Sequence, residues 1–90
     1  PCLDELLERS LPDDVEQRIT DLVLSVDGVS QPHHLRTRRI GNRYAIDLHI
    51  RMDGNMPLRE AHDRATRIEQ KLRDEYGKDT YINVHVEPEK

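Results

Sequence analysis

A histidine and a glutamate stand two residues apart near the C-terminus, in the stretch YINVHVEP at positions 81–88. Side chains on an extended strand alternate between its two faces, so His85 and Glu87 share one face and the valines beside them share the other. Imidazole and carboxylate groups together suit zinc and other first-row divalent ions. The stretch therefore favours a metal site, and an ordinary solvent-facing strand is the alternative.

A second alternating stretch carries further ligand-type residues. RYAIDLHIRMD, residues 43–53, places Asp47 and His49 on its polar face. If both stretches are strands of one sheet, Asp47, His49, His85 and Glu87 could converge on an open face. An exposed histidine on its own usually has no role, so the hypothesis depends on this convergence.

Three more histidines occupy other positions. His33 and His34 begin the strand before residue 43, and one of them can reach the same neighbourhood. His62 lies at the edge of the apolar stripe of a helix, where a half-buried packing histidine is expected. It could ligate a metal only if the helix layer meets the ion at the edge of the domain or if a second subunit supplies it.

Two amphipathic helices are expected to support these residues. Segment 11–29, LPDDVEQRITDLVLSVDGV, should begin near Pro12 and end at Gly28, and segment 58–77 should form the second helix. Their apolar residues recur at helical spacing. The predicted buried residues are Val15, Ile19, Leu22, Val23 and Val26 in the first helix, and Leu58, Ala61, Ala65, Ile68 and Leu72 in the second.

Three strands are expected, at residues 33–40, 43–53 and 80–88. The pair GN at positions 41 and 42 is typical of a hairpin turn between the first two strands. The order of elements predicts an α+β fold: a two-layer α-β-β-α-β sandwich whose three-stranded sheet carries two helices on one face. The polar strand faces then lie on the far side of the sheet, open to water or to another molecule.

Composition limits the possible functions. The chain has 90 residues, 34% apolar and 36% charged, so it forms one small domain whose core is lean enough to benefit from a partner subunit or a bound metal. A net charge of −4 argues against nucleic acid as a partner. A single cysteine allows no internal disulfide, and no apolar run reaches the length of a membrane span. No motif indicates catalysis, so we do not expect an enzyme.

The sequence divides into a short approach segment and a domain. We expect residues 1–10 to form a linker from a missing transmembrane domain, with one helical turn through Leu3, Leu6 and Leu7, and residues 11–90 to form the folded domain. Cys2 falls in the linker, and we expect it to be incidental.

Four stretches in order carry a family resemblance: DGVSQPHHLRTRRIG, IDLHI, PLREAHDRATRIEQKL and VHVEP. Together they resemble the C-terminal cytoplasmic domain of cation diffusion facilitator transporters, over about residues 11 to 88, and most of all the bacterial zinc and iron efflux branch. The resemblance implies a metallochaperone-like, ferredoxin-like fold. It also implies a V-shaped homodimer below a proton-coupled transmembrane antiporter, on the cytoplasmic side of the inner membrane, although this chain itself should be soluble.

The resemblance also implies a ligand set. The family's ligand positions fall on His33, His49, His62, His85 and Glu87. Glu87 stands where the efflux branch often has aspartate, and its side chain is one methylene longer. His34 replaces an aspartate that is common at its position, so it could be an extra or substitute ligand.

The function expected from residues and resemblance together is metal-dependent regulation of efflux. Metal binding between the two domains would tighten the homodimer, with Zn²⁺ as the expected ion and Fe²⁺, Cd²⁺, Co²⁺, Ni²⁺, Cu²⁺ or Mn²⁺ as further candidates. The alternative is a ferredoxin-like module for protein interaction or dimerisation that binds no metal.

Overall fold

The computed structural model describes residues 10–90 as two helices and a three-stranded sheet. The predicted helical turn through Leu3, Leu6 and Leu7, and most of the predicted linker, lie outside the described residues. The order of elements is α-β-β-α-β, as predicted. In chain order the elements are α2 (Asp13–Leu24), β1 (Ser30–Ile40), β2 (Arg43–Met52), α3 (Leu58–Tyr76) and β3 (Tyr81–Pro88).

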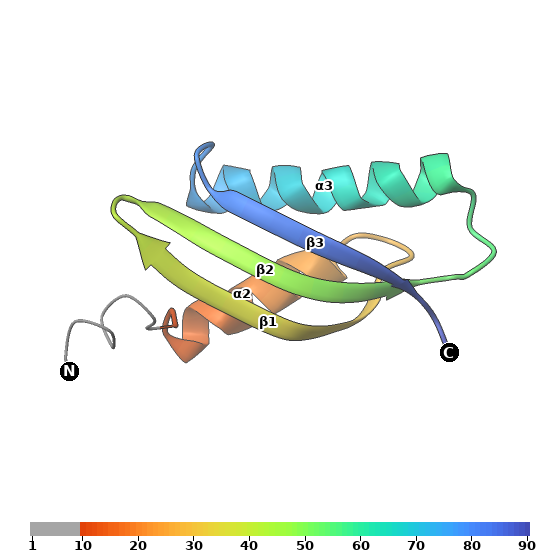
Figure 1. The fold of residues 1–90 in the computed structure, drawn as a ribbon, viewed down its shortest axis with the longest axis horizontal. Coiled ribbons are helices and arrows are strands. Elements are labelled where there is room, and N and C mark those ends of the chain that lie inside the picture. Colours follow the sequence, from red (N-terminus) through yellow and green to blue (C-terminus); the bar gives the residue numbers. More distant parts are fainter. Residues whose placement is uncertain (1–9) are drawn as a thin grey trace.

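The sheet has the strand order β1-β2-β3, with β2 in the centre. β1 and β2 are antiparallel and form the predicted hairpin, whereas β2 and β3 are parallel. Parallel neighbours need a crossover, and α3 provides it. Figure 1 shows the sheet passing in front of α2, with α3 running alongside β3. This is the predicted two-layer α+β sandwich.

The central strand supplies much of the core. Alternate residues of β2 are buried, which confirms the alternation expected from the sequence. They pack against apolar residues of both helices. The fully buried members of this core are Ile46, Leu48, Ile50 and Met52 of β2, Ile19 and Val23 of α2, Val26 after α2, and Ile68 and Leu72 of α3.

The first helix is shorter than expected. It ends at Leu24 rather than at Gly28. The Ser25 hydroxyl donates a hydrogen bond of 2.6 Å to the carbonyl of Leu22, and serine side chains that bond the backbone in this way compete with helix propagation. Val26 is nevertheless buried, because the turn after the helix keeps it against the core.

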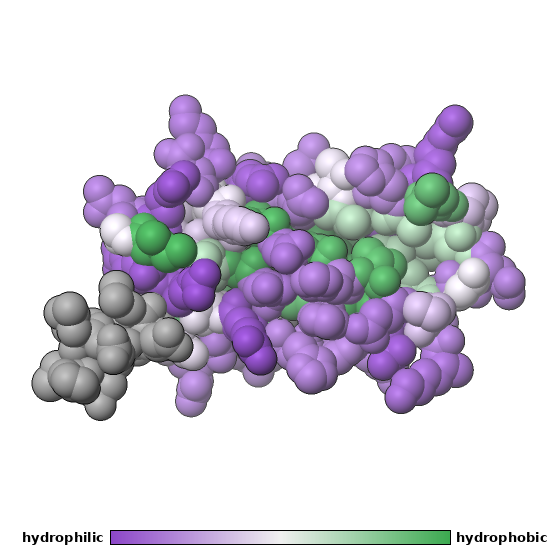
Figure 2. Space-filling view, viewed as in Figure 1, coloured by the Kyte–Doolittle hydropathy of each residue, from purple (hydrophilic) through white to green (hydrophobic). Residues whose placement is uncertain are grey.

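The end of the core beside α3 and β3 is more open than the sequence predicts. Leu58, expected in the buried stripe, is 85% exposed because it occupies the first turn of α3, and Val86 on the edge strand β3 is 45% exposed. In Figure 2 the surface is mostly hydrophilic, but a band of hydrophobic residues remains visible where Figure 1 shows β3 and α3. The prediction that Leu58 belongs to the core is therefore wrong.

Candidate metal centre

The strand register aligns three histidines across the sheet. His33 of β1 is the partner of His49 of β2, and His49 is the partner of His85 of β3. All three side chains lie on the face opposite the apolar residues of β2, so the helices do not cover them. The convergence expected from alternation is therefore present for these strands.

Glu87 joins two of these histidines. The Nδ1–H of His49 donates a hydrogen bond of 2.6 Å to Glu87 Oε2, and His33 Nε2 lies 3.3 Å from Glu87 Oε1. One ligand atom from each of the three residues lies within 4.8 Å of the others. Two imidazole nitrogens and a carboxylate oxygen at this separation are chemically suited to hold a divalent cation.

The surroundings of Glu87 favour its charged form. The hydrogen bond from His49 holds the pKa of the Glu87 carboxyl below its usual value, although partial burial opposes this effect. The nearby charges of His33 and Arg51 lower it further. A carboxylate that stays ionised is the form that ligates a metal ion.

His33 is oriented by its second ring nitrogen. Its Nδ1–H donates a hydrogen bond of 2.7 Å to the backbone carbonyl of Gln31, which leaves Nε2 directed at Glu87. Metal-ligating histidines usually donate their other N–H to a carbonyl or a carboxylate in this way. Gln31 has a positive φ of 47°, so its backbone adopts a conformation that non-glycine residues rarely use.

Both histidines of the HH pair reach the site, although the sequence indicated only one. The pairing of β1 with β2 is irregular on each side of His33, and His34 has a positive φ of 51°. An irregularity of this kind breaks the strict alternation of a strand. The ring of His34 consequently lies 5.1 Å from that of His33 and 5.2 Å from that of His49, centroid to centroid.

His85 lies beside the His33–His49–Glu87 cluster. Its ring stacks on that of His49, with centroids 4.4 Å apart. Its Nε2 lies 3.3 Å from Asp47 Oδ1 and 3.2 Å from Asn83 Nδ2. Of the residues expected on this face, His85 therefore pairs with Asp47 rather than with Glu87.

His62 is separate from the other candidates within the protomer. It lies on α3, the layer on the other side of the sheet, and it is exposed rather than half-buried as expected. His62 is therefore not the half-buried packing residue that its position at the edge of the apolar stripe predicts.

Arg51 also contacts the site, a role that was not predicted for it from the sequence. Its Nη2 lies 3.2 Å from Glu87 Oε1. The alternation of β2 places Arg51 on the same face as His49, so a signal existed. Only the parallel register, in which Arg51 is the partner of Glu87, shows that the two meet.

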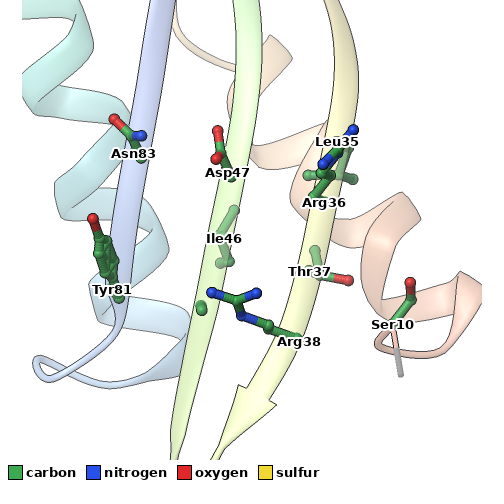
Figure 3. Close-up of a pocket in the computed structure, with 10 residues that line it drawn as sticks. Ser10, Leu35, Arg36, Thr37, Arg38, Ile46, Asp47, Tyr81 and Asn83 are labelled. Carbon is green, nitrogen blue, oxygen red and sulfur yellow. The ribbon is translucent and has the colours of Figure 1, made fainter. Parts of the chain in front are cut away.

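A pocket of about 450 Å³ occupies the other half of this face. It is bordered by Arg36 and Arg38 of β1, Asp47 of β2, and Tyr81 and Asn83 of β3. Figure 3 shows Arg38 extending from β1 towards β2. Polar residues therefore cover the open face along its length, and the histidines occupy one end.

The sequence and structure both match known proteins. A family model described as the cytoplasmic domain of cation efflux proteins matches residues 11–89. The chain belongs to this family. The cation-efflux pump FieF of Yersinia pestis is 48% identical over 71 residues, which are 79% of this chain and 24% of that protein. The resemblance to cation diffusion facilitator domains is thereby confirmed.

Solved structures of cation efflux domains share the fold. The cytosolic domain of a cation diffusion facilitator family protein superposes with a TM-score of 0.76 at 29% identity, covering 83% of this chain and 89% of that one. The metal-bound C-terminal domain of the CzcD transporter from Thermotoga maritima gives a TM-score of 0.69 at 28% identity, covering 86% and 94%. The chain thus corresponds to nearly all of these isolated domains.

The chain is a small part of the curated cation-efflux relatives. It spans about a quarter of the length of the pumps that it matches. Within residues 10–90, neither helix is long and apolar enough to cross a membrane.

Proposed function

We propose that this cytoplasmic domain senses a divalent metal ion of the zinc type and regulates the efflux transporter to which it belongs. The observation that carries the proposal is the approach of two imidazole nitrogens, from His33 and His49, to the carboxylate of Glu87. The matched CzcD domain is described as metal-bound, which supports the same chemistry here. Zinc is the proposed ion because imidazole and carboxylate ligands suit it, and Fe²⁺, Co²⁺, Ni²⁺, Cu²⁺, Cd²⁺ and Mn²⁺ are competitors.

The remaining histidines extend the proposed site. His34 and His85 stand close enough to His49 for small side-chain movements to bring them to a bound ion. His62 lies on the other side of the sheet, so as a ligand it would serve the partner subunit rather than its own. The proposed metal site therefore consists of three central residues, two neighbouring candidate ligands and one candidate ligand from the partner subunit of a dimer.

The proposed assembly is a homodimer. Residues 1–10 would connect each domain to a transmembrane, proton-coupled antiporter, and the domains would lie at the cytoplasmic side of the inner membrane. Two negatively charged protomers repel each other, and a bound cation reduces that repulsion. A metal can tighten a V-shaped dimer only if it binds the closed arrangement more strongly than the open one.

Calorimetric titration with zinc tests the metal site. We expect Glu87→Gln to weaken zinc binding by at least about tenfold, because even residues that only orient metal ligands change affinity by about 10- to 100-fold. Glu89→Gln is the matched control: it makes the same charge change two residues away, where Glu89 bonds Ser30 instead of the histidines. The double variant His49→Ala, His85→Ala should abolish binding.

Two results would contradict the proposal. One is a wild-type domain that binds no zinc, which would leave the non-metal interaction module as the better account. The other is equal loss of affinity in Glu87→Gln and Glu89→Gln, which would show that general surface charge attracts the ion and that the cluster does not bind it.

A further inference from the structure

Arg51 contacts two residues at the end of β3. Its Nη2 lies 3.2 Å from Glu87 Oε1, and its Nη1 donates a hydrogen bond of 3.0 Å to the backbone carbonyl of Pro88. Only 17% of its side chain is exposed, so the guanidinium is held against the cluster. Arg51 and Glu87 are direct neighbours in the parallel register, which fixes this contact through the backbone.

The Glu87 oxygen that Arg51 contacts is the one that also faces His33 of the proposed metal site. Glu87 Oε1 faces both Arg51 Nη2, at 3.2 Å, and His33 Nε2, at 3.3 Å. A guanidinium carries its positive charge at all accessible pH values, and a partly buried charge is poorly screened by salt. A divalent ion bound between His33 and Glu87 would therefore stand beside a permanent cation.

We propose that Arg51 is an internal competitor for the metal, a residue that lowers zinc affinity and releases Glu87 when the ion binds. This inference rests on the proposed function, because it concerns the same carboxylate. In the metal-free domain, the Arg51 guanidinium occupies Glu87 Oε1. When zinc binds, the Nη2 contact is lost while the rest of the strand stays paired.

The strand end has other attachments that allow this release. The backbone N–H of Glu89 donates to the carbonyl of Met52 at 2.8 Å, and the Ser30 hydroxyl donates to Glu89 Oε2 at 2.8 Å. The Nη1 bond from Arg51 to Pro88 can also persist while Nη2 moves. Exchange of the guanidinium for a metal therefore leaves β3 in the sheet, and the competition is confined to one oxygen.

A purely structural clamp makes the opposite prediction. If Arg51 only held Glu87 in position for the metal, its removal would loosen the carboxylate and weaken zinc binding. If Arg51 competes with the metal, its removal strengthens binding. The sign of the change therefore separates the two roles.

The experiment compares zinc affinity in four forms of the domain by calorimetry. We expect Arg51→Gln to bind zinc at least about fivefold more tightly, the lower end of the coupling usually found between two ligands. Arg51→Lys keeps the charge and should stay near the wild-type affinity. Arg38→Gln is the matched control, since it removes the same charge from the same sheet face beside the pocket, and it should also stay near wild type.

A measurement on the wild-type guanidinium tests the proposal even if a variant misfolds. In wild-type domain labelled with ¹⁵N, the Arg51 Nε–Hε resonance should move as zinc is added, while that of Arg38 stays in place. An Arg51 resonance that does not move while zinc binds would overturn the proposal. So would unchanged or weaker binding by a folded Arg51→Gln variant.

These outcomes separate the inference from the proposed function. Zinc binding by the wild type, with no gain in Arg51→Gln, overturns competition and leaves metal sensing intact. Zinc binding by Arg51→Gln alone supports competition but overturns metal sensing by the natural chain. Absence of binding in every form overturns both.

Discussion

Glu87 shows how single residues decide what this sheet face can do. Its carboxylate has three cationic or hydrogen-bonding neighbours, namely His33, His49 and Arg51. Alternation along the strands could predict that His49, His85 and Glu87 share a face. It could not predict that Glu87 pairs with His49 while His85 pairs with Asp47, because that depends on side-chain rotamers and on the strand register.

Thr37 is a second residue whose role depends on contacts distant in sequence. Thr37 is only 4% exposed. Its hydroxyl accepts a hydrogen bond of 3.0 Å from the backbone N–H of Leu11 and donates to the carboxylate of Glu16. It thus ties β1 to the start of α2, which the mixed polarity of this strand did not reveal.

Replacement of Thr37 by valine should destabilise the domain. The shape is nearly unchanged, but the buried N–H of Leu11 loses its acceptor, and an unsatisfied buried group costs about 1–3 kcal/mol. We expect the free energy of unfolding, measured by urea titration, to fall by that amount. Thr66→Val, at a half-buried position on α3, should change it by less than about 0.5 kcal/mol. Equal effects of the two variants would contradict the role assigned to Thr37.

Among the elements, the β1–β2 hairpin follows most directly from the sequence. Gly41 has a φ of +59°, and Asn42 is not among the residues with positive φ. A glycine with positive φ at the first of two turn residues is characteristic of a type II′ turn, whose twist matches that of the strands. The turn sets the register from Ile40–Arg43 to Arg36–Asp47, and the irregularity between His33 and Arg36 then brings His33 opposite His49.

The variant Gly41→Ala measures the free-energy cost of a positive φ at the first turn residue. A Cβ at Gly41 would meet no atom within 4 Å, so the cost comes from the positive φ alone. An L-residue in this region costs about 1–2 kcal/mol, and we expect the free energy of unfolding to fall by about that much. Gly54→Ala is the control, because its Cβ would make an ordinary contact with Pro88 at 3.5 Å. Similar stability of both variants would contradict the turn assignment.

The start of β1 is a part of the fold that the sequence does not predict. The sequence indicated a strand from His33, whereas the structure begins it at Ser30 and includes two irregularities in pairing. Non-glycine residues with positive φ, such as Gln31 and His34, have no local signal strong enough to reveal them. Both lie in the irregular part of the pairing between β1 and β2, and backbone strain of this kind often lies at functional sites.

At the scale of the whole molecule, the net charge and the small core both affect how two copies could associate. The described domain is elongated, about 47 × 27 × 20 Å, and its core is centred on one strand and two helices. The chain carries a net charge of −4, so two copies repel each other unless a cation lies between them. Composition favours support from a partner subunit or a bound metal, but it cannot say where a second copy would sit.

Zinc should therefore make the proposed homodimer more compact. We expect sedimentation to give a mass twice that of the chain, and small-angle X-ray scattering to give a smaller radius of gyration after zinc is added. Glu87→Gln should prevent the contraction, while Glu89→Gln should allow it. Sodium chloride near 0.1 M serves as a further control, because it screens charges beyond about 10 Å without occupying the cluster. Contraction by salt alone would show that general screening closes the dimer, and it would remove the regulatory role proposed for the His33–His49–Glu87 cluster.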